Sequence, residues 1–405
     1  MTNEHFNSIL TINSGSSSVK LALYHVGPSE MLILSGKIDR IGVAGSHFEM
    51  KDAGGKVLTR RELNLKDHEA SLKVLLDWLH DHVRRQGLDA VGHRVVHGGV
   101  KYICPHVITH ELLASLKKLI PLAPGHLPQA LRIIEAVREL YPTLKQVACF
   151  DTAFHRQMPE TAQMYALPRD LHNKGVIRYG FHGLSCEYLI QELRRQAGPE
   201  AADGRVLIAH LGNGASMTAV LHGKSVDTTM GFTPAGGLVM STRSGDLDPG
   251  VLVYLLEEEG VEVSALNEMV NRKSGLLGVS GISSDMKDIL DREKEDPRAA
   301  AAVNLFCYQA KKFLSALAAT LGGLDTLIFT AGVGENAPAI RWRICEGMEF
   351  LGIRLDSGRN DTNSPIISRE DSPCTVRVMR TDEDLMIARQ TNNFILGMKR
   401  GDHHG

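Results

Sequence analysis

Two stretches of the chain repeat one local design, and this repetition constrains the fold more than any other feature of the sequence. Residues 9–27 are ILTINSGSSSVKLALYHVG, and residues 206–224 are VLIAHLGNGASMTAVLHGK. Each contains an apolar run, a turn of small residues, a second apolar run and a second glycine turn, which is typical of a β-hairpin. Two such hairpins about one domain apart predict a duplicated chain with a cleft between the copies.

Predicted helices alternate with short apolar strands along the rest of the chain. Apolar residues recur at helical spacing at Leu72, Leu75, Leu76, Leu79 and Val83, and Gly87 can end that helix. An aspartate followed by a proline is typical of a helix start, and it opens two further predicted helices, 248–260 and 296–322. Strands are expected at 147–150, 206–211 and 326–330. This alternation predicts an α/β fold.

Length and composition limit the classes of protein that the chain can belong to. With 405 residues it is too long for one ordinary core, so we expect two domains, with a boundary near residue 151. The 43% hydrophobic and 23% charged residues are typical of a globular protein. A net charge of -2 gives no reason to expect a nucleic acid or an anionic membrane as partner.

The six cysteines lie far apart, without a C-x-x-C pair, so neither a disulfide framework nor a zinc site is predicted. The first residues, MTNEHFNS, lack the basic and apolar regions of a signal peptide, and no apolar run is long enough to span a bilayer. These features predict a cytoplasmic protein with reduced thiols.

The turn in NSGSSSVK (13–20) offers backbone N–H groups, hydroxyls and one ammonium, which together suit an anion. It is not a Walker A loop, because the G-x-x-x-x-G-K-[ST] spacing is absent. Taken alone, the segment is better explained as an ordinary hairpin turn. The second turn, HLGNGAS (210–216), favours the anion hypothesis, since two such turns facing one cleft would suit a polyphosphate.

The segment FTAGVGENA (329–337) contains G-x-G-x-x-A after a predicted strand, with Asp356 downstream where a dinucleotide fold has its ribose-binding acid. A Rossmann motif usually occupies the first strand-helix unit, whereas this one comes late. The same residues are also compatible with a glycine turn that contacts the base or ribose of a nucleotide.

Single charged residues add further candidates. Asp151 ends an apolar strand, where open α/β sheets face their ligand. Arg94 and Arg243 could bind an oxyanion through a bidentate fork, although a structural ion pair is the ordinary role of an arginine. His126 and His182 could equally be packing residues. The acidic run 382–384 could hold a hard cation or simply open a helix.

Together these segments resemble the acetate kinase family, the short-chain carboxylate kinases of the acetate and sugar kinase, Hsp70 and actin superfamily. The first and second family signatures are similar to NSGSSSVK and to MGFTPAGGLVMSTRSGDLDPG (230–250). Six more motifs follow in family order: HRVVHGG, FDTAFH, YGFHG, HLGNGAS, GVGEN and DEDLMIAR.

The resemblance implies two duplicated ribonuclease H-like domains of the actin-like ATPase fold, an α/β architecture with a central nucleotide cleft. Residues 1–151 plus 388–405 would form the acyl-substrate and phosphate domain, and residues 152–387 the nucleotide-binding domain. It also implies ATP as co-substrate, Mg²⁺ with Mn²⁺ as a substitute, and a homodimer. The implied reaction is reversible, direct in-line phosphoryl transfer between ATP and acetate, giving acetyl phosphate and ADP.

The resemblance also assigns roles to residues at the family's motif positions. Catalytic positions match Asp151, Arg94, Arg243, His182 and His126. Substrate-binding positions match Arg94, Val96, Phe181 and Pro234, and the magnesium positions match Asn13 and Glu383. ATP-binding positions match Ser16, Ser18, Lys20, His210, Leu211, Gly212, Asn213, Gly214, Asp285, Met286, Lys287, Gly332, Val333, Gly334, Glu335 and Asn336.

Departures from the common family pattern occur at a few positions. Gly125 stands where the family often has leucine beside the substrate methyl group, so a larger acyl group such as propionate could fit, unless Leu127 fills the gap. Leu184 and Cys186 replace common threonine and histidine behind His182. Lys287 replaces a usual arginine near the nucleotide, which removes a planar stacking group.

Other functions remain as alternatives. Within enzymes these are a propionate kinase or broad short-chain acyl kinase, or a relative that uses pyrophosphate. An Hsp70-like or actin-like ATP-binding module would share the two turns but would not need Arg94, His126, His182 and Arg243. A dinucleotide oxidoreductase is suggested only by GVGENA.

Overall fold

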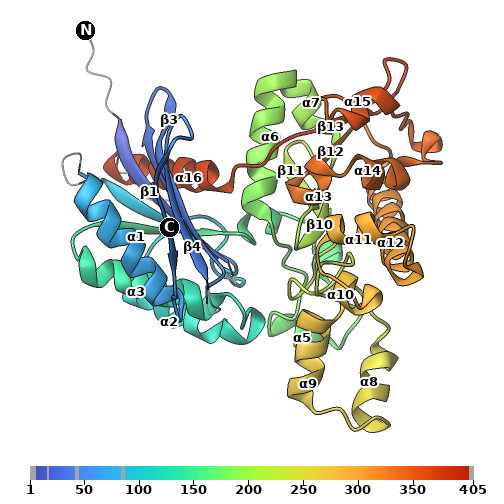
Figure 1. Ribbon diagram of the computed structural model, residues 1–405, viewed down its shortest axis with the longest axis horizontal. Coiled ribbons are helices and arrows are strands. Elements are labelled where there is room, and N and C mark those ends of the chain that lie inside the picture. The colour runs from blue at the N-terminus through green and yellow to red at the C-terminus, as the bar shows by residue number, and fades with distance from the viewer. Residues whose placement is uncertain (1–5, 16–17, 42–44, 84–86, 401–405) are drawn as a thin grey trace. The chain divides into compact units, whose positions relative to one another are not determined.

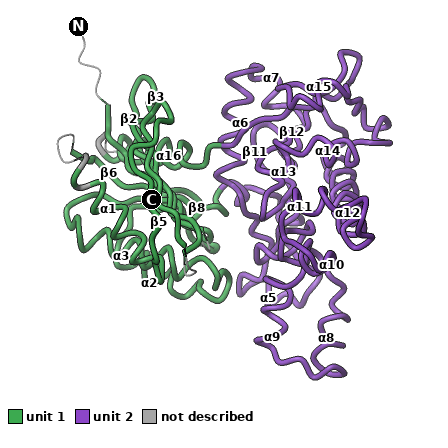
Figure 2. The backbone as a smooth tube through the Cα atoms, viewed as in Figure 1, with its two compact units in different colours: residues 1–153, 382–405 green, residues 154–381 purple. Residues whose placement is uncertain are grey.

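The computed structural model describes residues 6–15, 18–41, 45–83 and 87–400, and they form two compact units. Unit 1 comprises residues 1–153 and 382–405, and unit 2 comprises residues 154–381 (Figure 2). The two domains expected from the sequence, residues 1–151 plus 388–405 and residues 152–387, stay a prediction.

Unit 1 contains an eight-stranded sheet in the order β5-β4-β3-β2-β1-β6-β8-β7. Its strands are β1 (Asn7–Ser14), β2 (Ser18–Val26), β3 (Glu30–Asp39), β4 (Ser46–Asp52), β5 (Val57–Leu63), β6 (Ala90–Val95), β7 (His106–Val107) and β8 (Lys145–Phe150). Its helices are α1 (His68–Val83), α2 (His110–Lys118), the short η1 (Ile120–Leu122), α3 (Leu127–Leu140) and α16 (Glu383–Arg400). The first five strands are antiparallel, whereas β1, β6 and β8 are parallel to one another.

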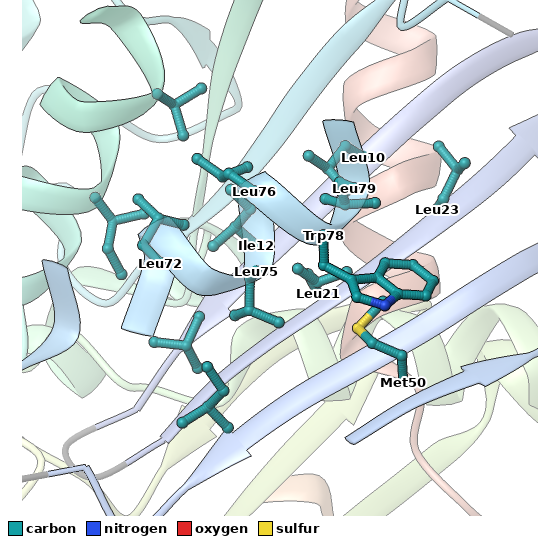
Figure 3. Close-up of a cluster of buried hydrophobic side chains, with 14 of the residues drawn as sticks. Leu10, Ile12, Leu21, Leu23, Met50, Leu72, Leu75, Leu76, Trp78 and Leu79 are labelled. Carbon is teal, nitrogen blue, oxygen red and sulfur yellow. The ribbon is translucent and has the colours of Figure 1, made fainter. Parts of the chain in front are cut away.

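Alternation along the strands divides the core of unit 1 between the two faces of the sheet. Leu10 and Ile12 of β1 pack in a large apolar cluster with residues of α1 and α3, while Ile9 packs with residues of α16 on the other face. Figure 3 shows the first cluster, in which the Trp78 ring lies beside Met50. The helix predicted from the leucine spacing is therefore confirmed as α1, which begins at His68.

Unit 2 contains a five-stranded sheet in the order β11-β10-β9-β12-β13. Its strands are β9 (Arg205–Leu211), β10 (Ala215–Leu221), β11 (Lys224–Thr228), β12 (Thr326–Thr330) and β13 (Thr375–Val378). Residues of α6 pack on one face of this sheet, and α12 contacts β10. Figure 1 labels these elements. The predicted strands at 147–150, 206–211 and 326–330 are confirmed as β8, β9 and β12.

The helices of unit 2 are α4 (Glu160–Gln163), α5 (Arg169–Asn173), α6 (Gly183–Ala197), α7 (Pro199–Asp203), α8 (Pro249–Glu257), α9 (Val263–Glu268), α10 (Gly275–Ser280), α11 (Met286–Arg292), α12 (Pro297–Leu321), α13 (Ala331–Asn336), α14 (Pro338–Cys345) and α15 (Ser357–Asp361). Some of these helices, such as α7, α12 and α13, contact the sheet of unit 2, whereas α8 and α9 contact each other. Single turns lie at η2 (Ala153–His155), η3 (Met269–Lys273) and η4 (Glu349–Leu351).

Local capping explains two of the predicted helices. The Asp296 side chain accepts from the Arg298 N–H (2.9 Å) at the start of α12, and Gly322 ends the helix at a left-handed φ of 72°. Asp248 caps α8 in the same way, accepting from the Gly250 N–H (2.6 Å). That helix stops at Glu257, short of the expected Gly260.

All six cysteines lie within the described residues, and none of them forms a disulfide. None of the helices in the described ranges combines the length and the apolar character needed to cross a bilayer.

Candidate active site

Four side chains from separate elements meet at one end of the unit 1 sheet. The Arg94 guanidinium on β6 donates from Nε to both carboxylate oxygens of Asp151 (3.1 and 3.0 Å) and from Nη2 to Oδ2 (2.7 Å). Its Nη1 donates to Asn13 Oδ1 on β1 (3.1 Å), and Asn13 Nδ2 donates to Glu383 Oε2 at the start of α16 (3.1 Å). The parallel strands β1, β6 and β8 bring these residues together because their carboxyl ends share one edge of the sheet.

In the pair formed by Arg94 and Asp151, the carboxylate is buried and the guanidinium is partly buried. Asp151 is only 1% exposed, so burial raises its pKa, and the Arg94 guanidinium opposes that rise. Burial also works against the charge of Arg94, but Asp151 and Glu383 outweigh it and raise the pKa of the guanidinium. The arginine therefore keeps its charge, and Asp151 is its counter-ion.

The acidic run at the start of α16 lies in the partial positive charge of the helix N-terminus. Asp382 accepts from the Leu385 N–H (2.8 Å), so the helix-terminus explanation holds for this residue. Burial, reinforced by the Asp382 carboxylate, raises the pKa of Asp384 to about 6. The buried Asp384 Oδ1 has no hydrogen-bond partner within the part of the chain that the structure describes.

The donor atoms of this cluster suit a hard cation. Asn13 offers an amide oxygen, which here accepts from Arg94 Nη1, and Glu383 offers a carboxylate, whose Oε2 here accepts from Asn13 Nδ2. No three His, Cys, Asp or Glu side chains in the described ranges converge into a metal cage. Since Mg²⁺ commonly takes one or two carboxylates and completes its shell with water and phosphate oxygens, the two residues fit the ion.

Unit 1 also holds the residues expected near the acyl group. Val96 is buried directly after β6, and His126 precedes α3 as its N-cap residue without a side-chain capping bond. A Cβ built on Gly125 would meet no atom of the described residues within 4 Å. Leu127, which could have filled that space, is fully buried instead, so the region beside Gly125 is open in unit 1.

His182 anchors a polar network in unit 2. It is the N-cap residue of α6 and has a left-handed backbone, with φ 59°. Its Nδ1 lies 2.9 Å from Ser216 Oγ on β10, and its ring stacks on His210 at 4.1 Å between centroids and 15° between planes. His210 Nδ1 in turn lies 2.9 Å from Ser185 Oγ, which lies 2.8 Å from Thr381 Oγ1.

Arg243 approaches the same place from the loop that follows β11. Its Nη1 donates to the Pro234 carbonyl (2.6 Å). A Cβ on Gly214 would lie 2.7 Å from Arg243 Nη2 and 3.3 Å from His182 Nε2. The absence of a side chain at Gly214 is therefore what allows the guanidinium and the imidazole to meet over the β9–β10 turn.

A cavity of about 580 Å³ lies beside that turn, within unit 2. Two of its walls are the segments expected at the nucleotide, since its lining includes Asp285, Met286 and Lys287 and also Gly332, Val333 and Asn336. Gly212, Asn213 and Ser241 complete the wall next to the turn. This volume and its mixed polar and apolar lining fall within the range of small-molecule sites.

Several residues expected at ATP lie away from this cavity. Its lining does not include His210, Leu211, Gly214, Gly334 or Glu335. The Glu335 carboxylate instead turns back and accepts from the Ala331 N–H (2.9 Å), closing the start of α13. In unit 1, Ser18 and the exposed Lys20 lie on β2, and Ser16 lies outside the described residues.

The structure contradicts the dinucleotide interpretation of GVGENA. Asp356 accepts from the Arg359 N–H (2.8 Å) and so caps α15. The sheet also begins with the antiparallel strands β9 to β11, which a Rossmann core would not contain. Cys186 and Leu184, the departures behind His182, are both buried.

Sequence reasoning missed the hydroxyls that orient the histidines, Ser185, Ser216 and Thr381. Ser216 closes the motif HLGNGAS, so its place in a strand facing the turn was a usable signal. Nothing in the local sequence connects Ser185 with Thr381, which are joined only by the fold.

Comparison with known proteins gives one consistent result. The model of the acetokinase family matches residues 8–389. The chain is 47% identical over 389 residues to an acetate kinase of Rhodopseudomonas palustris, which covers 94% of this chain and 96% of that protein. Two solved structures are similar over 96% of the chain. The acetate kinase of Porphyromonas gingivalis has a TM-score of 0.86, 41% identity and 100% coverage.

The second structure is a propionate kinase from Francisella tularensis, with a TM-score of 0.88, 36% identity and 99% coverage of that chain. Both structures match the two-sheet α/β architecture, with a duplicated core of the actin-like ATPase type. By the extent and consistency of these matches, the protein belongs to the acetokinase family.

Proposed function

We propose that the protein is an ATP-dependent acetate kinase, which reversibly transfers the γ-phosphoryl group of ATP directly and in line to acetate. The observation that carries the proposal is the hydrogen-bonded cluster of Arg94, Asp151, Asn13 and Glu383 in a member of this family. It combines a fixed cation with the oxygen donors that a phosphoryl transfer requires.

Phosphoryl transfer to a carboxylate does not require a strong general base. A carboxylic acid is already ionised at neutral pH, so acetate can attack phosphorus without losing a proton first. Catalysis then depends on alignment and on neutralising the charge of a loose, metaphosphate-like phosphoryl group. Cationic side chains in fixed positions are therefore the groups to assign.

In unit 1, we assign Arg94 to the acyl carboxylate, with Val96 and His126 beside it. Asn13 and Glu383 would hold Mg²⁺, which would supply charge neutralisation to the phosphates when bound. Asp151 keeps Arg94 oriented through its three hydrogen bonds and is available to position the metal. Ser16, Ser18 and Lys20 would contact phosphate.

In unit 2, we assign Arg243 and His182 to the transferring phosphoryl group, with Phe181 and Pro234 beside the acyl group. Residues 210–214 would bind the ATP phosphates. The 580 Å³ cavity between residues 285–287 and 332–336 would take the adenosine, a use that its lining supports. Because this function uses ATP, which is available in the cytoplasm, we also propose a cytoplasmic location.

A specific observation favours propionate as a second substrate. The space around Gly125 is open, and each additional buried methylene contributes about 0.8 kcal/mol to binding. A broad short-chain acyl kinase is therefore the second candidate function.

We also propose a homodimer. Helix α8 contains no buried residue, and Val251, Val253 and Tyr254 are each about half exposed. A second copy could cover the same face symmetrically, as in most homodimers. Light scattering of the protein and of Val253→Glu would test this, since the substitution should favour the monomer, and a monomeric wild type would reject the proposal.

The test of the function is acyl phosphate formation, trapped as hydroxamate, with ATP and Mg²⁺ and with formate, acetate, propionate or butyrate. Turnover with acetate that disappears in Asp151→Asn and Arg243→Ala would support it. Turnover only with pyrophosphate, or with none of the four acids, would reject an ATP-dependent carboxylate kinase.

A further inference from the structure

His155 is a completely buried histidine that none of the roles above uses. It ends the motif FDTAFH and lies in unit 2, within the turn η2. Its ring bridges two parts of the chain, because Nδ1 lies 2.9 Å from Ser225 Oγ on β11 and Nε2 lies 2.9 Å from the Phe181 carbonyl oxygen.

The partners determine which nitrogen carries the proton. A carbonyl can only accept, so Nε2 must donate to Phe181 O. Burial lowers the pKa of His155 to about 4, so the ring is neutral and Nδ1 accepts from the Ser225 hydroxyl. His155 therefore connects β11 through Ser225 with the residue that precedes His182.

The segment that His155 holds is strained. Gly180 has φ 74° and His182 has φ 59°, which is an uncommon conformation for a residue with a side chain. A Cβ on Gly180 would lie 2.6 Å from His155 Cγ, so the ring packs directly against this backbone. Such conformations persist where the surroundings over-determine them, and His155 supplies a hydrogen bond and a packing surface at this corner.

The corner in turn aims the His182 ring. From this backbone the ring stacks on His210 and places Nδ1 beside Ser216, which leaves Nε2 toward Gly214 and Arg243. A rotation of the 180–182 backbone would move the imidazole away from both contacts.

We propose that His155 is a positioning residue for His182: its hydrogen bond to the Phe181 carbonyl keeps His182 in the left-handed conformation that points the imidazole at the transferring group. This inference rests on the proposed function, in which His182 contacts the phosphoryl group.

Two substitutions separate the hydrogen bond to Phe181 from the bond to Ser225. Glutamine can place its amide N–H where Nε2 lies, whereas the shorter asparagine reaches only the position of Nδ1. His155→Asn should lower kcat by about 10- to 100-fold, the effect of a small misplacement, with KM values within about twofold. His155→Gln should retain most of the wild-type kcat. Equal losses in both variants would overturn the inference.

A double-mutant cycle provides the stricter test. If His155 acts through His182, then His155→Asn should cause no further loss of kcat in a His182→Ala background. A merely structural role predicts that the two losses multiply, and this result would overturn the inference. If His155→Asn does not fold, Ser225→Ala can replace it in the cycle, because it removes the hydrogen bond on the other side of the His155 ring. Ser225→Ala should lower kcat by about threefold, and this loss should be absent in the His182→Ala background.

Measurements on the wild type and on His182→Ala distinguish a failure of this inference from a failure of the proposed function. Wild-type hydroxamate formation tests the reaction itself. Active wild type with a strongly impaired but measurable His182→Ala, together with an unaffected His155→Asn, would overturn only the positioning role. Full activity of His182→Ala would overturn the assignment of His182 and this inference together.

Discussion

In unit 1, strands β3, β2, β1, β6 and β8 lie in the same order as β11, β10, β9, β12 and β13 in unit 2. The directions agree as well, with two antiparallel pairings followed by two parallel ones in each sheet. The duplication predicted from the two hairpins is therefore confirmed.

The two sheets differ after the last strand of this shared order, which is β8 in unit 1 and β13 in unit 2. The Asp151 N–H donates to the Val95 carbonyl (3.0 Å), and the Met379 N–H donates to the Phe329 carbonyl at the same distance. Counted from these two hydrogen bonds, Arg94 and Asp151 in unit 1 correspond to Ile328 and Met379 in unit 2, which are both buried in an apolar cluster. One backbone frame supports an ion pair in one copy and an apolar contact in the other.

The largest effect is expected from exchanging these two pairs. Asp151→Met should abolish acyl phosphate formation and destabilise unit 1 by about 3 kcal/mol, because it removes the nearest counter-ion of the partly buried Arg94 and leaves only Glu383, at 3.7 Å. The double variant Arg94→Ile/Asp151→Met copies unit 2 and should recover most of that stability but none of the activity. Urea unfolding measures the stability of each variant, and the hydroxamate assay measures its activity. A double variant as unstable as the single one would mean that the two positions are not interchangeable.

Next in size is the effect of a methyl group on the β9–β10 turn. Gly214→Ala should lower kcat by about 100-fold, since the new Cβ would displace Arg243 and His182, while unfolding changes little. The matched control in unit 1 is Gly397→Ala in α16, where a Cβ meets nothing within 4 Å. That substitution should leave kcat unchanged and stabilise the protein by about 0.5–1 kcal/mol. Unchanged kcat in Gly214→Ala would contradict the assigned roles of both side chains.

Each unit also contains a neutral, buried histidine. Burial lowers the pKa of His93, which lies 2.7 Å from Gln146 Oε1, and of His155 to about 4. Both folded pKa values lie below the usual 6.5, so the unfolded state binds more protons as the pH falls from about 6.5 to 4. Stability is therefore present above pH 6.5 and is lost below it, by about 1.4 kcal/mol per pH unit and histidine.

His93→Gln and His155→Gln should each reduce this acid sensitivity in their own unit. Urea midpoints at pH 7 and pH 5 measure it, and hydrogen exchange assigns the change to one unit. An unchanged slope in both variants would show that other groups carry the acid sensitivity.

The smallest effect concerns the acyl chain. Gly125→Leu should reduce kcat/KM for propionate relative to acetate by about tenfold, as expected for filling the space of one methylene. Hydroxamate kinetics with both acids check it. A wild type that uses propionate no better than acetate, together with no change in Gly125→Leu, would leave Gly125 without a role in specificity.

Much of the fold could be predicted because its signals are local. Alternating apolar residues, Asp-Pro helix starts and small-residue turns depend only on neighbours in sequence, and they indicated β9, β12, α8 and α12. The positions of Arg94, Asp151, Asn13 and Glu383 could be named from motifs, but their mutual hydrogen bonds could not. Asn13 and Glu383 are 370 residues apart, and no local pattern connects them.

Local sequence was enough to predict the duplicated hairpins, the starts of α8 and α12 and the residue types available for phosphate and metal. The packing of distant segments, by contrast, pairs Arg94 with Asp151, leaves room at Gly214 for Arg243 and His182, and turns Glu335 back to cap its own helix. The reason is physical: periodicity and capping are set by neighbouring residues, whereas ion pairing, close approach and burial depend on which distant backbone segments the packed sheets bring within a few ångströms.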